Sequence, residues 1–126
     1  MADCDVCLSM GDGDGCCEFY DSKIVTARKN HTCDECRLPI VRGLRYWRSV
    51  GKWEGEVSSF KECLLCYEIR EVFSCGEGWM HGAGLWEAMA DYVFPSLKTS
   101  SPCFAKLTHA AKQFVLDRWA KWKGLR

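Results

Sequence analysis

The chain has no uninterrupted apolar stretch approaching the 18 residues that a membrane-spanning helix needs, and this lack argues against a membrane protein. It also has no basic stretch followed by an apolar segment near residue 1, where the order Met-Ala-Asp-Cys-Asp stands instead. A secretory leader is therefore not expected, and the sequence predicts a reducing, cytoplasmic location.

Histidine is scarce, with three in 126 residues, and this scarcity bears on catalysis. A zinc deaminase needs a His-x-Glu motif, which does not occur here. A nuclease of the His-Asn-His type needs histidines between Trp47 and Phe73, where there are none. A cysteine nucleophile needs a partner base, a role for which no sequence pattern places His81 or His109. The sequence therefore predicts a binding protein and not an enzyme.

The formal net charge of zero hides a strong difference between the two ends of the chain. Residues 1–22 hold six carboxylates and no Lys or Arg, whereas residues 97–126 hold seven basic residues and one Asp, a net of minus six against plus six. This difference predicts either that the acidic arm folds back on the basic segment or that one of the two binds an external partner.

Ten cysteines are the most informative residues that are present. Two Cys-x2-Cys pairs are separated by 26 residues, and their members are Cys33, Cys36, Cys63 and Cys66. Two such pairs supply the four thiolates of one tetrahedral zinc, and in a reducing compartment they favour a metal over disulfides. The sequence therefore predicts one structural zinc bound by these four residues.

A second zinc is also expected, because Cys4 and Cys7 form a further pair with the same spacing. The candidates for its remaining ligands are Cys16, Cys17, Cys75 and His81. Adjacent cysteines rarely both bind one tetrahedral ion, so we expect one of the first two candidates together with one of the last two. The alternative is that the N-terminal cysteines are free thiols and that Cys103 is a buried apolar residue.

Local patterns predict the elements around the first zinc. Two runs rich in aromatic and β-branched residues, 44–50 and 56–60, predict a β-hairpin. Ser59 followed three residues later by Glu62 predicts a capped helix that ends near residue 74 and holds the second cysteine pair in its first turn.

Two further helices are predicted in the C-terminal half. Residues 85–93 have apolar side chains at helical spacing and are followed by Pro95. Ser101 and Pro102 predict the start of one long helix that runs to Lys123. Its apolar stripe consists of Leu107, Ala111, Phe114, Val115, Trp119 and Trp122. We expect Leu107, Phe114 and Val115 to pack in the core.

We call the turn that carries Cys33 and Cys36 the knuckle. The order of knuckle, hairpin and helix over residues 31–74 resembles a treble clef of the kind found in LIM-like zinc modules. The resemblance implies a small metal-stabilised α+β fold, namely a treble-clef zinc module with appended C-terminal helices. We therefore divide the chain into an acidic, cysteine-containing arm (1–22), the zinc module (23–75) and a helical region packed on it (76–126), which together are expected to form one folded unit.

Four stretches carry a wider pattern: Ala27-Arg-Lys-Asn-His-Thr-Cys-Asp-Glu-Cys36, Gly43-x-x-Tyr46, Gly51-Lys-Trp-Glu-Gly55 and Phe60-Lys-x-Cys-x-x-Cys66. This pattern is similar to that of small proteins encoded by bacteriophages and their bacterial hosts. The similarity spans about residues 18–92, including Trp79-x-His81-Gly82 and Leu85-Trp86-Glu87, and it leaves the C-terminal helix outside. Many small phage proteins bind and disable a host enzyme or defence complex. The resemblance thus implies an inhibitor or modulator of a host protein, for example an anti-CRISPR.

Two sets of residues are candidates for partner contacts, and the sequence leaves the oligomeric state open. For a protein partner we expect tryptophans and cations of the C-terminal region, namely Trp79, Trp119, Trp122, Lys121 and Lys123. For direct nucleic-acid binding in transcription or phage DNA metabolism, the candidates are Arg28, Lys29, Arg42, Arg45, Arg48, Trp47 and Trp53. Carboxylates in the same region and the neutral total weigh against the second set.

Overall fold

The computed structural model describes residues 19–53, 55–73 and 84–124. Its strands are β1 (Phe19–Thr26), β2 (His31–Thr32), β3 (Pro39–Ile40), β4 (Arg45–Trp53) and β5 (Glu56–Cys63). Its helices are α1 (Leu64–Phe73), α2 (Leu85–Ala88), the π-helical turn η1 (Met89–Val93), α3 (Pro102–Ala105) and α4 (His109–Gly124). This part of the chain is a small mixed α+β fold with a cluster of four cysteines.

The larger sheet is antiparallel and has the order β1-β4-β5. The expected hairpin is confirmed as β4 and β5, which pair from Trp53 opposite Glu56 to Tyr46 opposite Cys63. Gly55 occupies a left-handed conformation with φ 83° in the turn between them, which a residue without Cβ adopts freely. The edge strand β1 pairs with β4 over its whole length. The short strands β2 and β3 form a second sheet on either side of the first cysteine pair.

The start of the first helix differs from the expectation. Ser59 and Glu62 do not form a capping box, because both lie in β5, where Ser59 is opposite Val50. The helix α1 begins only at Leu64, so Cys63 ends the strand and Cys66 alone lies in the first helical turn. Pairing with β4 here overrides a local helix signal, as tertiary contacts often do.

The expected single C-terminal helix is two helices. Ser101 precedes α3 and Pro102 occupies its first turn, as predicted, but α3 ends at Ala105 and α4 begins at His109. Thr108 is the reason for the new start. Its Oγ1 accepts a hydrogen bond from the backbone N–H of Ala111 at 3.3 Å, which caps α4. The predicted helix over 85–93 is present as α2 and η1.

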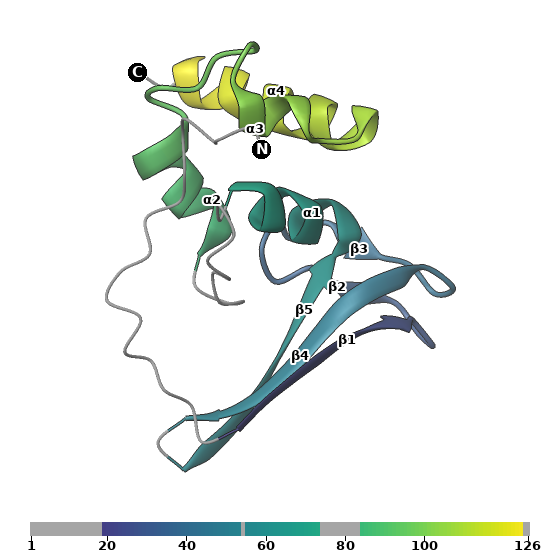
Figure 1. The fold of residues 1–126 in the computed structure, drawn as a ribbon. Coiled ribbons are helices and arrows are strands. Elements are labelled where there is room, and N and C mark those ends of the chain that lie inside the picture. The colour runs from purple at the N-terminus through teal and green to yellow at the C-terminus, as the bar shows by residue number, and fades with distance from the viewer. Residues whose placement is uncertain (1–18, 54, 74–83, 125–126) are drawn as a thin grey trace.

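The helices pack around one apolar core at one end of the larger sheet. In Figure 1, α3 and α4 lie over α1, while the far end of the β4–β5 hairpin extends away from them. The core includes fully buried Phe73, Leu85, Met89 and Val115, and the expected burial of Leu107 at 4% exposure is confirmed. Phe114 is half-buried against it. The division at residues 22 and 75 stays a prediction.

Within the described ranges, none of the helices combines the length and apolar character required to cross a membrane.

Candidate metal centre

The first cysteine pair lies on a tight turn between β2 and β3. The backbone N–H of Cys33 donates to the carbonyl of Leu38 at 2.9 Å, and the N–H of Arg37 donates back to the carbonyl of Cys33 at 3.0 Å. Arg37 takes a left-handed conformation with φ 65°, which is uncommon for a residue with a side chain. The turn also directs the N–H of Cys36 at the Sγ of Cys33, 3.5 Å away. Both thiols therefore face the same side.

The second pair spans the junction of β5 and α1. The N–H of Cys66 donates to the Sγ of Cys63 at 3.5 Å, the same arrangement as in the first pair. Two hydrogen bonds join the pairs: the backbone N–H of Asp34 donates to the carbonyl of Lys61, and the backbone N–H of Lys61 donates to the side-chain Oδ2 of Asp34, each at 2.8 Å. The N–H of Cys63 also reaches the Sγ of Cys33 at 3.3 Å.

The structure brings all four predicted zinc ligands together. Their Sγ atoms lie within 4.8 Å of one another, and those of Cys36 and Cys63 are 3.8 Å apart. Four sulfurs at about 2.3 Å from a central zinc would stand about 3.8 Å from one another in a tetrahedron. Cys33 and Cys66 are fully buried, and Cys36 is 6% exposed. The cluster can hold a metal ion, and its four-thiol donor set fits a structural zinc.

The four thiols cannot all ionise without a cation. Hydrogen bonds from Cys36, Cys63 and Cys66 hold the pKa of Cys33 well below its usual range. The pKa of Cys36 is lowered to about 7, since Cys33 raises it but Cys63 and Cys66 lower it by more. The pKa values of Cys63 and Cys66 are raised, mainly by Cys33 and Cys36. Cys63 and Cys66 therefore favour their protonated forms, and a metal held by the four thiols would displace these protons.

Two residues far away in sequence complete the surroundings of the cluster. The indole Nε1 of Trp86 donates to the Sγ of Cys66 at 3.4 Å. The guanidinium of Arg118 lies 4.6 Å from the centre of the Trp86 ring, and its Nη2 donates to the carbonyl of Cys36 at 3.2 Å. A zinc with four thiolates carries a net charge of minus two, so a fixed N–H and a nearby cation stabilise it.

The sequence contained no clear signal for Trp86 or Arg118 as neighbours of the metal. Trp86 stands 20 residues and Arg118 82 residues from the cysteine that each contacts. The knuckle is joined to α2 in a similar way, because the N–H of Leu85 donates to Glu35 Oε1 at 3.0 Å.

The expected second zinc falls outside the described residues. This holds for all its candidate ligands, namely Cys4, Cys7, Cys16, Cys17, Cys75 and His81. In the part of the chain that the structure describes, no second group of three or more Cys, His, Asp or Glu gathers its ligand atoms in this way. Cys103 is fully buried in α3, as its alternative interpretation expects, but it is disulfide-bonded, whereas the four cluster cysteines are free thiols.

Of the candidate protein contacts, Trp79 also lies outside the described residues. Trp119 and Trp122 are half-buried on α4. The indole N–H of Trp119 donates to the carbonyl of Phe94 at 3.2 Å, and the Trp122 ring lies 5.7 Å from the Phe94 ring. Lys121 and Lys123 are exposed, and the ammonium of Lys123 lies 4.0 Å from the centre of the Trp119 ring.

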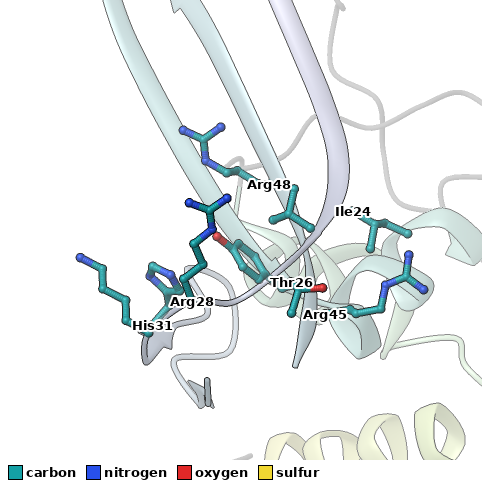
Figure 2. A pocket seen from close by; sticks show the side chains of 9 residues that line it. Ile24, Thr26, Arg28, His31, Arg45 and Arg48 are labelled. Carbon is teal, nitrogen blue, oxygen red and sulfur yellow. The ribbon is translucent and has the colours of Figure 1, made fainter. Parts of the chain in front are cut away.

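Apart from the cysteine cluster, a concave surface lies where β1 ends and the chain turns toward β2. We call it the basic groove. It encloses about 1010 Å³, and four of its lining residues are the cations Arg28, Lys29, Arg45 and Arg48. Figure 2 shows the charged ends of the three arginines spread around the end of β1, with His31 between the loop and the sheet.

Comparison of the chain with protein-family models, with curated proteins and with solved structures finds no match. The similarity to small phage-encoded proteins therefore stays a prediction.

Proposed function

We propose that this chain is a zinc-stabilised binding protein whose metal module is a treble clef, and that it acts by binding and not by catalysis. The observation that carries the proposal is the closed cluster of four thiols. Four protein ligands complete the coordination of a structural zinc, whereas a catalytic zinc keeps one position for water or substrate. The order of knuckle, β4–β5 hairpin and α1, with a cysteine pair at each end, supports the treble clef.

The proposed partner is a protein, and the proposed role is that of a phage-encoded inhibitor or modulator of a host protein or defence complex in the bacterial cytoplasm. The end of α4 supports this role, since it combines two partly exposed tryptophans with the exposed cations Lys121 and Lys123. Tryptophan is among the residues that contribute most to protein interfaces. Apolar side chains that flank β3 in the sequence add a further surface, because Leu38 and Leu44 are 49% and 51% exposed.

Affinity capture from host-cell extract tests the protein partner. The native chain and three variants are compared: Lys121→Glu/Lys123→Glu on α4, Leu38→Asp/Leu44→Asp on either side of β3, and Val57→Asp as the control. Val57 is an exposed apolar residue on β5, 62% accessible, that belongs to neither surface. We expect a protein that is captured by the native chain and the control and lost with the α4 variant. Equal capture by all four chains would contradict both surfaces.

Direct nucleic-acid binding is the second candidate function. One observation favours it, namely the basic groove with its four cations.

A further inference from the structure

We propose that the basic groove binds the phosphate backbone of a nucleic acid without reading its sequence. The inference rests on the second candidate function, and it adds the surface, the ligand chemistry and the mode of recognition. It does not depend on the protein partner, because the four cations of the groove are not among the residues proposed to contact that partner.

The residues that line the groove include four cations and no carboxylate. Arg28, Lys29, Arg45 and Arg48 are all exposed, and among the described residues none of them forms an ion pair. A concave surface lined by uncompensated charges of one sign concentrates the field and attracts a ligand of the opposite sign.

The strand register extends this positive charge across the sheet. Arg48 of β4 stands directly opposite Lys23 of β1 on one side and opposite Lys61 of β5 on the other. Directly opposite residues share a face, so three cations form a row across three strands, and such like-charge pairs repel one another. At about 4.8 Å between strands the row spans about 10 Å. Asp21 lies on the same face of β1, two residues from Lys23. It is opposite Val50, so it is a neighbour of the row and not a member of it.

The chemistry of the lining cations indicates the kind of anion that they would bind. Three of the four lining cations are arginines. A guanidinium presents parallel N–H donors that match phosphate oxygens in pairs, and arginine is accordingly favoured in phosphate recognition. A polymer with regularly spaced phosphates can bridge the groove and the row, which a single phosphate cannot span. A nucleic-acid backbone has this spacing, with about one charge per 3.4 Å along each strand.

The described aromatic side chains of this face are not placed to stack on bases. Trp47, expected to belong to the basic and aromatic face, instead stacks on Tyr67 of α1 with ring centres 4.3 Å apart. Tyr46 lines the groove but is only 5% exposed, and His31 is half-buried 5.3 Å from its ring. The side chain of Trp53 lies outside the described part of the structure. Among the side chains that the structure describes here, cations are thus offered to the ligand and broad aromatic faces are not, which predicts sequence-independent binding.

Fluorescence anisotropy with a labelled, mixed-sequence single-stranded DNA tests the inference. If about four phosphates are contacted, native affinity falls about 50-fold between 50 and 200 mM salt. Arg28→Gln/Arg48→Gln removes two of the contacts, so we expect affinity at 50 mM salt to fall about 10-fold and the salt-dependent loss to shrink to about 7-fold. Lys29→Gln/Arg45→Gln is a second pair from the same groove with the same expected result.

The matched control is Arg37→Gln/Lys98→Gln, which removes the same charge from exposed residues outside the groove. Its affinity should stay within about twofold of native, since non-specific binding depends on the phosphates that are contacted and not on total charge. If both groove pairs bind DNA as well as the control does, the groove assignment is wrong while nucleic-acid binding stands. If the native chain shows no salt-dependent binding, the second candidate function and this inference both fail.

Discussion

At the cysteine cluster, polar groups are satisfied from within the chain, whereas the described residues provide no counter-charge at the basic groove. The Sγ of Cys33 accepts two backbone N–H groups and that of Cys66 accepts the indole of Trp86. Arg118, the nearby cation, lies over the Trp86 ring and donates a hydrogen bond to the carbonyl of Cys36. By contrast, Arg48 faces two further cations across the sheet. At the cluster the chain itself supplies the hydrogen bonds and the cation that would support a bound metal, and this arrangement stabilises the fold. The cations of the groove have no such support from the described residues and are available to an external anion.

Removal of the metal from the cluster should have the largest effect on the stability of the chain. In Cys66→Ser, or in the native chain with excess chelator, we expect the cooperative unfolding transition to be lost. Zinc contributes about 10–16 kcal/mol in small zinc domains, which is comparable to the entire stability of a protein of about 5–15 kcal/mol. Circular dichroism during heating measures this. The exposed-site variant Ser58→Ala should behave as the native chain does, and an unchanged transition after chelation would contradict a structural metal.

The buried ion pair between β5 and α1 should have the next largest effect. Glu62 and Arg70 are 1% and 2% exposed, and Arg70 Nε lies 3.3 Å from Glu62 Oε1. Arg70→Met leaves a buried carboxylate without this partner, so we expect a loss of about 3–5 kcal/mol in the free energy of unfolding. Glu62→Gln/Arg70→Met should recover part of the loss. Denaturant titration checks both values, and a loss under about 1 kcal/mol in the single variant would show that the pair is unimportant.

Replacement of the Trp86 indole distinguishes an effect on metal binding from an effect on packing. Trp86→Phe keeps a ring but removes the N–H that reaches Cys66, so zinc affinity should fall about 10- to 100-fold, as for other residues that support metal ligands. Trp119→Phe is the matched control, because its indole N–H donates to the carbonyl of Phe94 and not to a cysteine. Competition with a zinc-binding dye measures both. Equal zinc affinity in the two variants would be evidence against the role of Trp86.

The start of α4 should show a smaller effect. Thr108 caps the helix, and its N–H and Oγ1 donate to Glu68 of α1 at 2.6 and 2.9 Å. Thr108→Ala should therefore cost about 0.5–2 kcal/mol in the free energy of unfolding. Thr108→Ser retains the hydroxyl and should stay near the native value. The same stability in both variants would mean that the hydroxyl is not needed to begin α4.

Neutralisation of the central cation of the row should have the smallest effect and the opposite sign. Arg48→Gln removes repulsion from Lys23 and Lys61, so the free energy of unfolding should rise by about 0.2–1 kcal/mol at low salt. Addition of salt should reduce this gain, because it screens exposed charges. Arg37→Gln, outside the row, should cause no rise. A destabilised Arg48→Gln chain would indicate that Arg48 has a structural role.

The metal cluster could be predicted because its ligands follow local spacing rules. The Cys-x2-Cys pattern fixes two thiols on one turn, and only one long-range step joins the pairs. The extension of β5 to Cys63 was missed, because the capping signal of Ser59 and Glu62 is local while the pairing with β4 is not. The start of α4 directly after Thr108 was also missed, because Thr108 is held by hydrogen bonds to Glu68 of another helix.

The basic groove was predicted in part. Its cations were identified from their charge, but the position of Trp47 was not, because the face of a strand residue depends on the register and on what packs against it. Arg45 and Arg48 come from β4, while Arg28 and Lys29 follow β1, so the groove forms only when these strands pair.

Elemental mass spectrometry of the purified chain tests the central claim most directly, together with the variants Cys33→Ser/Cys63→Ser and Cys4→Ser/Cys7→Ser. We predict a zinc that is present in the native protein, absent from the first variant and retained in the second. Well-folded native protein without zinc, or a zinc content unchanged in Cys33→Ser/Cys63→Ser, would contradict the account.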